Sequence, residues 1–311
     1  MRVVVVGLGA MGSNHARVVA AHPVAQLVGV CDTDAAVAQA TGERYGVPWS
    51  TAWDGSIACD AVIVATPTAG HPALVAELLD AGLPTLVEKP VAEDPADVAA
   101  LVERSRADGV ALMCGFVERY NPAVQTAIEV LDGPPVHVVA LRHSPATPRA
   151  TASVVHDLLI HDLDLSLRIM GAPATSVAAT AWRSPAGIAE VADATLGFAG
   201  GLATVSASRI GHRKVRALQI TTASEQIEVD MLRHDVTVYR HRSHEQLDGF
   251  GPTYRAESVI DIPFVRHAGE PLAQQLDAFV TLVQGEGDVE GERTSILEPH
   301  RIAAEIEALL P

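Results

Sequence analysis

The chain has 311 residues, which at roughly 150 residues per domain corresponds to about two domains with hydrophobic cores of their own. Its 22 Lys and Arg against 38 Asp and Glu give a net charge of −16, which repels nucleic acid and acidic membrane surfaces and disfavours either as a partner. Cys31, Cys59 and Cys114 are too widely spaced for a disulfide framework or a zinc ribbon, so we expect a cytoplasmic protein.

The first third of the chain alternates short β-branched segments with helical patterns, as in the βαβ units of a parallel sheet. The opening MRVVVVGLG predicts a strand, because glycine interrupts it before a secretory signal could form, and no later segment reaches the ~18 apolar residues of a membrane helix. Strands are predicted over 2–6, 26–31, 48–50, 61–65, 84–88 and 111–116, and helices over 14–21, 35–45, 72–81 and 95–107. These elements predict a doubly wound α/β domain over residues 1–118.

The pattern changes after a predicted helix over 123–131. Period-two segments predict strands over 136–142, 177–182, 192–198, 202–208, 215–222, 226–230 and 236–241. Because few crossover helices separate them, we expect an open, mostly antiparallel sheet in an α+β domain over 119–311. The polar segment 242–256 is predicted to be a long surface loop. Helices over 271–283 and 299–309 complete the chain, and the last of them could pack back on the first domain.

A glycine-rich turn follows the first predicted strand and precedes a helix. The motif GxGxxG supplies Gly7, Gly9, Ala10, Met11 and Gly12 as candidate dinucleotide-binding residues. Asp32, followed by Thr33, ends the second strand twenty residues after Gly12, where a carboxylate accepts hydrogen bonds from a ribose diol. No arginine follows to pair with a 2′-phosphate, so the sequence favours NAD over NADP. The alternative is a glycine turn that binds no nucleotide.

Further candidates follow the fourth and fifth predicted strands. Thr66 and Pro67 end one strand with His71 shortly beyond, and Glu88-Lys89-Pro90 ends the next. Ligands of open α/β sheets bind outside the carboxyl ends of the strands, so we expect Thr66, Pro67, His71, Glu88 and Lys89 to lie around the cofactor. Lys89 would point toward its reactive ring. The alternative for Lys89 is an ordinary solvated loop lysine.

A polar stripe crosses the apolar helix predicted over 156–168. Asp157, His161, Asp164 and Arg168 follow the i, i+4, i+7, i+11 spacing of one helix face, so we expect that face to line a cleft. The alternative is a solvated or internally paired face. His156 and Asp157 are adjacent and point about 100° apart on a helix, which disfavours a metal site with His161, and no metal is predicted.

These motifs, in this order, resemble the glucose–fructose oxidoreductase, inositol dehydrogenase and MocA (Gfo/Idh/MocA) family over essentially the whole chain. The motifs are GLGAMG, the ATP turn with His71, EKP and DLLIHDLD. The resemblance implies a Rossmann domain, a second domain whose open sheet builds the substrate cleft, and NAD(P)-linked chemistry at a sugar or polyol carbon. It also implies that Lys89, Asp157 and His161 form the catalytic set.

A finer resemblance joins the segment 115–124, Arg142, Arg149 and the helix that contains DLLIHDLD. These are similar to the branch of the family that oxidises the 3-hydroxyl of UDP-N-acetylglucosamine or a related nucleotide sugar, although His156 and the loop 144–149 depart from its usual pattern. Arg142 and Arg149 are candidate phosphate partners, because guanidinium matches phosphate geometry, with surface arginines as the alternative. The substrate-binding residues that the resemblance implies are Lys89, Glu118, Arg119, Asn121, Arg142, Arg149, Asp157 and His161.

The chemistry requires a base for the hydroxyl proton and a cation for the developing alkoxide. His161 and Lys89 fit these two roles, with the direct base left open between them, and Asp157 would orient the imidazole. Three other functions stay open: a dehydrogenase of a free or phosphorylated sugar, an inositol or an aminosugar; an enzyme with a transient 3-keto step and no net NADH; and a non-catalytic NAD-responsive regulator. The period-two surface of strands 202–208 and 215–222 predicts a homodimer or homotetramer.

Overall fold

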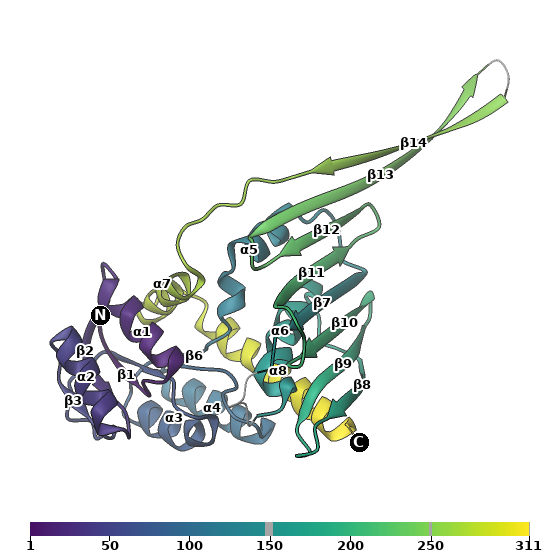
Figure 1. Cartoon of the computed structure of the whole chain (residues 1–311). Helices are drawn as coiled ribbons and strands as arrows, with labels where there is room; N and C mark the ends of the chain where they lie inside the picture. Colours follow the sequence, from purple (N-terminus) through teal and green to yellow (C-terminus); the bar gives the residue numbers. More distant parts are fainter. Residues whose placement is uncertain (147–151, 249–250, 311) are drawn as a thin grey trace. The chain divides into compact units, whose positions relative to one another are not determined.

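The computed structural model describes residues 1–146, 152–248 and 251–310, and the chain divides into two compact units (Figure 1). The first unit comprises residues 1–117 and 269–304, and the second comprises 118–268 and 305–311. The first division falls between Val117 and Glu118. Residues 269–304 belong to the first unit, although the sequence analysis placed them in the second domain.

The first unit contains a parallel sheet with the strand order β3-β2-β1-β4-β5-β6, the order of the Rossmann fold. Its inner strands are buried along their whole length, because their β-branched residues face helices on both sides. The strands are β1 (Arg2–Val6), β2 (Gln26–Cys31), β3 (Trp49–Ser50), β4 (Ala61–Val64), β5 (Thr85–Val87) and β6 (Leu112–Cys114). The helices between them are α1 (Ala10–Ala21), α2 (Ala35–Tyr45), the short 3-10 helix η1 (Thr68–Gly70), α3 (His71–Asp80) and α4 (Pro95–Asp108). The predicted doubly wound domain is confirmed.

Two C-terminal helices, α7 (Pro271–Val283) and α8 (Val289–Leu309), follow the second unit in the chain. α7 contacts α1. The prediction that the last helix begins at 299 is wrong, because Pro299 lies inside α8 rather than in its first turn. Tertiary contacts stabilise the ten residues that precede it: Arg293 is buried and its guanidinium donates to the carbonyls of Ser105 and Val110.

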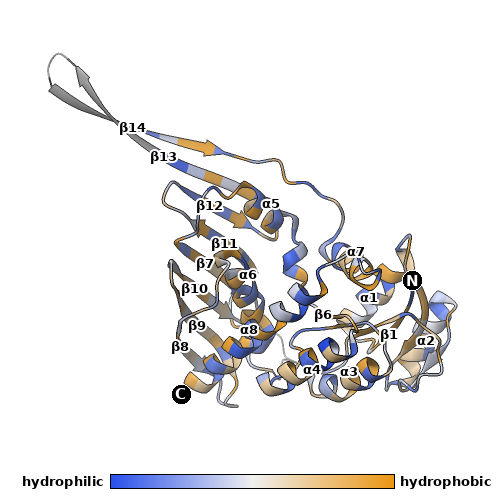
Figure 2. Cartoon of the chain, turned by 180° about the vertical axis from the view of Figure 1, so that it is seen from behind, coloured by the Kyte–Doolittle hydropathy of each residue, from blue (hydrophilic) through white to orange (hydrophobic). Residues whose placement is uncertain are grey.

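The second unit is built on an eight-stranded sheet with the order β14-β13-β12-β11-β7-β10-β9-β8. All neighbouring pairs are antiparallel except β7 and β10. Helices α5 and α6 pack on it (Figure 2). The strands are β7 (His137–His143), β8 (Ser176–Arg183), β9 (Ala189–Phe198), β10 (Gly201–Ser208), β11 (Val215–Thr221), β12 (Glu225–Asp230), β13 (Asp235–Asp248) and β14 (Gly251–Asp261). The helices are the 3-10 helix η2 (Val117–Tyr120), α5 (Pro122–Val130), the π-helix η3 (Val155–Leu159) and α6 (Ile160–Met170). The predicted α+β class is confirmed.

The prediction of a surface loop over 242–256 is wrong. This segment forms most of the β13–β14 hairpin, whose register runs from Val238 opposite Asp261 to Asp248 opposite Gly251. Its polar composition indicates a loop because it lacks a buried apolar face. The two strands instead satisfy each other's backbone groups through the ladder, which needs no apolar alternation.

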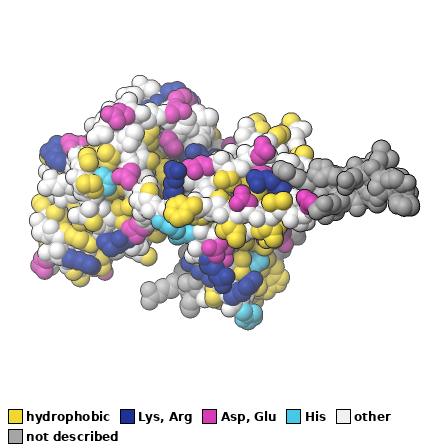
Figure 3. Space-filling model, turned by 90° about the horizontal axis from the view of Figure 1, so that it is seen from above, with side chains coloured by type: hydrophobic (Ala, Val, Ile, Leu, Met, Phe, Trp, Pro, Cys, Tyr) yellow, Lys and Arg dark blue, Asp and Glu magenta, His cyan; other side chains and the backbone are white. Residues whose placement is uncertain are grey.

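The net charge of −16 is carried by side chains of both signs. On the face drawn in Figure 3, acidic and basic side chains are interspersed with apolar ones. Within the described parts of the chain, no helix is long and apolar enough to cross a membrane.

Candidate functional site

A cavity of about 710 Å³ lies in the first unit at the carboxyl ends of its strands, and its volume is within the range of small-molecule and cofactor sites. It opens where the strand order reverses between β1 and β4, the position at which open α/β sheets bind their ligands. Its walls are Val6, Gly7, Gly9, Cys31, Asp32, Thr33, Thr51, Ala52, Trp53, Ala65, Thr66, Pro67, Gly70 and Leu74. Five of the expected cofactor residues other than Asp32 are therefore in its wall.

The sequence analysis missed the segment Thr51–Trp53, which follows β3. Its signal was available, since the carboxyl end of every parallel strand faces the same edge of the sheet.

The carboxylate of Asp32 is fixed in this wall by two backbone donors. The amide of Leu8 donates to Oδ2 over 2.6 Å, and the amide of Asp34 donates to Oδ1 over 2.9 Å. These bonds couple the glycine loop after β1 to the end of β2. Each carboxylate oxygen has a second lone pair, so Asp32 can still accept from a ribose diol.

The glycine loop leaves room for a pyrophosphate. A Cβ added to Gly9 would meet no atom within 4 Å, whereas one added to Gly12 would lie 1.7 Å from the carbonyl oxygen of Gly7. Gly12 thus lets α1 approach the loop, and Gly9 leaves open space at the N-terminus of α1, where helical amides favour an anion.

Ala10 and Met11 form the first turn of α1 beyond this opening. In the opposite wall, the buried Oγ1 of Thr66 has no hydrogen-bond partner among the described residues. These features fit a dinucleotide.

Lys89, Glu88 and His71 lie in the first unit but do not line the cavity. Lys89 is half-buried in the segment after β5. Glu88 is buried and faces His15, with 2.7 Å between Oε1 and Nε2. His71 is buried between the carbonyl oxygens of Thr66 and Pro90. Glu88 and His71 are therefore engaged by the protein, although both were expected to contact the cofactor.

The polar helix that was predicted over 156–168 begins as a π-helix and continues as α6. A π turn holds an extra residue, so side chains four apart no longer stack across it. The expected single polar face is therefore wrong: Asp157 and His161 are half-buried, Asp164 is buried and Arg168 is exposed. Asp157 accepts a hydrogen bond from the buried Arg209 over 3.3 Å, which fixes its carboxylate at the N-terminal end of the helix.

A buried ion-pair network supports this helix. Arg142 on β7 donates to both carboxylate oxygens of Asp162 over 2.9 and 2.8 Å and to Glu118 over 2.6 Å. Although burial works against it, the Arg142 charge lowers the pKa of Glu118, and although burial lowers the pKa of Arg142, the two carboxylates raise it. Burial raises the pKa of Asp162 against the opposing charge of Arg142. The Arg142 guanidinium is thus held by two carboxylates and not presented to a phosphate.

Arg119 and Asn121 also have structural partners. Arg119 is 6% exposed and forms a bidentate pair with Asp164 over 2.9 and 2.5 Å. Asn121 caps α5 by accepting from Ala123, and its amide donates to the carbonyl of Met231. Arg149 lies outside the described residues. Within the described ranges, no group of three or more His, Cys, Asp and Glu side chains is arranged to hold a metal ion.

The expected catalytic residues divide between the units. Lys89 belongs to the first unit, and Asp157 and His161 belong to the second. Each side chain is thus placed within its own unit, as described above.

Comparisons with known proteins cover both units. The family model "Oxidoreductase family, NAD-binding Rossmann fold" matches residues 1–116, and the "GFO/IDH/MocA C-terminal domain" matches 136–228. The chain is 32% identical to UDP-N-acetylglucosamine 3-dehydrogenase of Acidithiobacillus ferrooxidans over 83% of its own length and 82% of the relative. It is 28% identical to the scyllo-inositol 2-dehydrogenase (NAD(+)) of Bacillus subtilis over 92% of each chain.

A solved structure agrees with these matches. The UDP-N-acetylglucosamine 3-dehydrogenase GnnA of Acidithiobacillus ferrooxidans superimposes with a TM-score of 0.87 and 27% identity, covering 100% of this chain and 97% of the other. The family resemblance and the NAD cofactor expected from the sequence are confirmed. With both domain models matched in order and a relative aligned over most of its length, the chain belongs to the Gfo/Idh/MocA family of NAD-binding oxidoreductases.

Proposed function

We propose that this protein oxidises the 3-hydroxyl of UDP-N-acetylglucosamine, or of a closely related nucleotide sugar, with NAD as the hydride acceptor. The observation that carries the proposal is the full-length likeness to a protein of that name, at 32% identity in sequence and a TM-score of 0.87 in structure. The cavity beside Asp32 supports the cofactor part of the proposal through its size and its free acceptor and donor positions.

NAD, when bound, supplies the hydride acceptor, and the side chains must manage the hydroxyl proton. We propose that Lys89 and His161 act on the same hydroxyl, one as the base and the other as the group that stabilises negative charge on oxygen. Asp157, one turn before His161 and fixed by Arg209, would orient the imidazole or stabilise its protonated form.

The residue composition supports a proton-exchanging role for Lys89. The chain contains 20 arginines but only two lysines, Lys89 and Lys214. Arginine stays protonated in proteins, whereas a lysine amine can release and regain a proton. A chain that uses arginine for nearly all of its cations therefore has at position 89 the cation that can take part in acid–base chemistry.

Arg142 is not part of the proposed substrate contacts. Its pairs with Asp162 and Glu118 join β7 to α6, so we propose that it supports the helix that carries His161. The phosphate contact expected of it from the sequence does not agree with this geometry.

An inositol is the alternative substrate class, favoured by the 28% identity to an inositol dehydrogenase over 92% of the chain. A panel of UDP-N-acetylglucosamine, UDP-glucose, N-acetylglucosamine 1-phosphate, free N-acetylglucosamine, myo-inositol and scyllo-inositol separates the two. We expect NADH formation and a keto product, two mass units lighter, to be fastest with UDP-N-acetylglucosamine. Faster turnover of either inositol would overturn the proposal.

The same panel tests two other functions. Product of altered mass without accumulation of NADH would indicate a redox-neutral reaction through a transient ketone. NADH binding without turnover of any sugar would indicate a regulatory protein. Either result would contradict the proposed net oxidation.

Asp32 should make the protein prefer NAD, because its carboxylate accepts from a ribose diol and repels a 2′-phosphate. Asp32→Ala should lower kcat/KM for NAD by about 10- to 100-fold, since a hydrogen bond to a charged group contributes about 1.5–3 kcal/mol. Values for NADP should change less, so the preference should narrow. Steady-state kinetics with both cofactors measure this, and equal or better efficiency of the unaltered protein with NADP would contradict the role of Asp32.

Lys89→Met and His161→Ala should each lower kcat by about 10²- to 10⁴-fold, the usual contribution of a positioned acid–base group. Because the two groups act as a unit, the double variant should be scarcely slower than the slower single variant. NADH affinity, measured by fluorescence, should stay close to that of the unaltered protein because Asp32 and the glycine loop are untouched. Near-normal turnover in either single variant removes that residue from the mechanism.

The sheet of the second unit predicts self-association. Leu141, Trp182 and Leu202 on three of its strands are 36%, 51% and 41% exposed, on the face opposite the buried Val138 and Ala140. Such an apolar face is typically covered by a partner, and we propose a second copy of the chain.

Light scattering at micromolar concentration should give at least a dimer. Leu202→Lys should shift it toward the monomer by placing a charge in the interface. Ile128→Lys on α5, which alters an exposed apolar residue of the same unit, serves as the control and should leave the assembly intact. A monomeric unaltered protein would contradict this proposal.

A further inference from the structure

Three buried histidines surround the segment Glu88–Val91, which carries Lys89. His15 on α1, His71 on α3 and His300 on α8 are 2%, 1% and 1% exposed, and each contacts a different residue of this segment. We call these three side chains the histidine cradle. All of them belong to the first unit.

His15 fixes the start of the segment. Its Nε2 lies 2.7 Å from Oε1 of Glu88, and because an ionised carboxylate only accepts, the ring must donate. On the other side, a Cβ added to Gly115 would lie 2.9 Å from the carboxyl group of Glu88. The Glu88 side chain is therefore enclosed between α1 and the end of β6.

His300 fixes the end of the segment. Its Nε2 accepts a hydrogen bond from the backbone amide of Val91 over 2.9 Å. An amide can only donate, so Nε2 carries no hydrogen and Nδ1 must be the protonated nitrogen, which donates to the carbonyl of Ile296 over 2.7 Å. The ring is thus held in one neutral tautomer, and protonation of Nε2 would break its bond to Val91.

His71 joins the segment to the wall of the cofactor cavity. Its Nδ1 lies 2.9 Å from the carbonyl oxygen of Pro90, and its Nε2 lies 2.8 Å from that of Thr66. Both partners are acceptors, so a neutral ring donates to one of them and only a doubly protonated ring donates to both. Since Thr66 lines the cavity, this contact ties the position of the Lys89 segment to the cofactor site.

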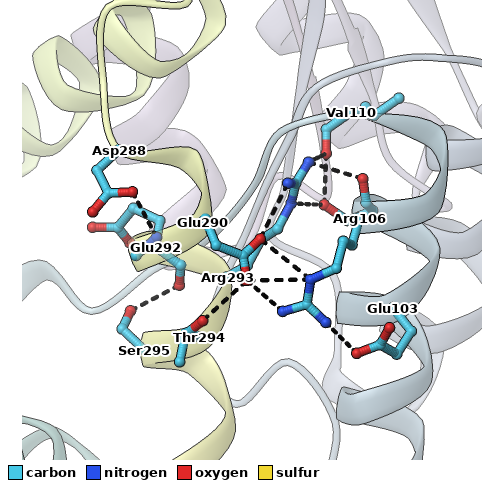
Figure 4. Close-up of polar contacts among 11 residues, drawn as sticks. Glu103, Arg106, Val110, Asp288, Glu290, Glu292, Arg293, Thr294 and Ser295 are labelled. Atoms are coloured by element: carbon cyan, nitrogen blue, oxygen red, sulfur yellow. Dashed lines mark hydrogen bonds and ion pairs between the residues drawn. The ribbon is translucent and has the colours of Figure 1, made fainter.

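The helix that supplies His300 has its own anchor on the first unit. Arg293 of α8 donates to the carbonyls of Ser105 and Val110 over 2.8 Å each, and Arg106 of α4 pairs with Glu290 (Figure 4). These contacts hold α8 against the end of α4. They explain how a residue 209 positions away from Val91 in the sequence can bind it.

We propose that the histidine cradle positions Lys89, with His300 as the residue that completes it from the C-terminal helix. Contacts to the Glu88 carboxylate, the Pro90 carbonyl and the Val91 amide restrain the chain on both sides of Lys89 and set the direction of its side chain. The histidines act through the backbone and are positioning residues. The consequence for turnover rests on the proposed role of Lys89, whereas the restraint itself does not.

The test compares two pairs of variants with a control. His300→Phe keeps an aromatic ring but removes the acceptor for Val91, and His300→Gln restores an acceptor oxygen. His15→Leu and His15→Gln remove and keep a donor to Glu88 in the same way. Arg293→Met is the matched control, because it removes buried hydrogen bonds from the same helix without touching the Lys89 segment.

The first measurement does not depend on activity. Reductive methylation with ¹³C-formaldehyde labels the two lysines and the N-terminus, and the NMR signal of Lys89 is assigned by its loss in Lys89→Arg. We expect this signal to shift or broaden in His300→Phe and His15→Leu, to return toward its normal position in the Gln variants, and to stay unchanged in Arg293→Met. The Lys214 signal, from the second unit, should not move in any variant.

The second measurement is turnover of UDP-N-acetylglucosamine. A displaced catalytic group can cost up to about 10²-fold in rate, so we expect His300→Phe and His15→Leu to lower kcat by about 10- to 10²-fold with NADH affinity retained. The Gln variants should recover part of the loss. Arg293→Met should lower Tm but keep kcat.

An unchanged Lys89 signal in the folded His300 and His15 variants would overturn the cradle. So would equal losses of kcat in His300→Phe and Arg293→Met at equal Tm. If His300→Phe does not fold, the His15 pair and His300→Gln decide the outcome by the same signal. An unaltered protein that is inactive on UDP-N-acetylglucosamine while the Lys89 signal still responds would contradict the proposed substrate and not the cradle.

Discussion

The hydrogen bond from the Leu8 amide to the Asp32 carboxylate couples the two loops on which the cofactor site depends. It joins the glycine turn after β1 to the end of β2, at the edge where all parallel strands of the first unit present their carboxyl ends. Because Asp32 is fixed by backbone donors, the cavity has its shape and its acceptor before a ligand arrives. Such preorganisation reduces the ordering that binding would otherwise require.

The second unit places its helix by paired buried charges. Arg142 and Arg119 hold Asp162 and Asp164, two carboxylates of α6 that are 0% and 4% exposed. Each charge is tolerated in the interior because its partner satisfies it with bidentate geometry. Removing one partner would leave a buried charge uncompensated, so these pairs fix α6, and His161 with it, more firmly than the apolar face alone.

Local pattern was sufficient where an element depends on its own residues. β1, β2 and α2 have the predicted bounds, because β-branched runs form the strands and the Asp34 cap and left-handed Gly46 delimit the helix. The GxGxxG turn and Asp32 were likewise predictable, since their spacing follows from the βαβ unit. The hairpin β13–β14 and the first ten residues of α8 were not, because cross-strand pairing and contacts such as that of Arg293 with Ser105 stabilise them.

The sequence by itself determined the fold class, the cofactor and the residues available for chemistry, because each of these follows from short motifs and their order. Tertiary structure decided what those residues contact. Arg142, Glu88 and His71 were expected to face ligands and are instead held by Asp162, His15 and two carbonyls. A polar side chain in a motif can bind a ligand or another part of the chain, and only the three-dimensional arrangement of donors, acceptors and charges around it decides between the two.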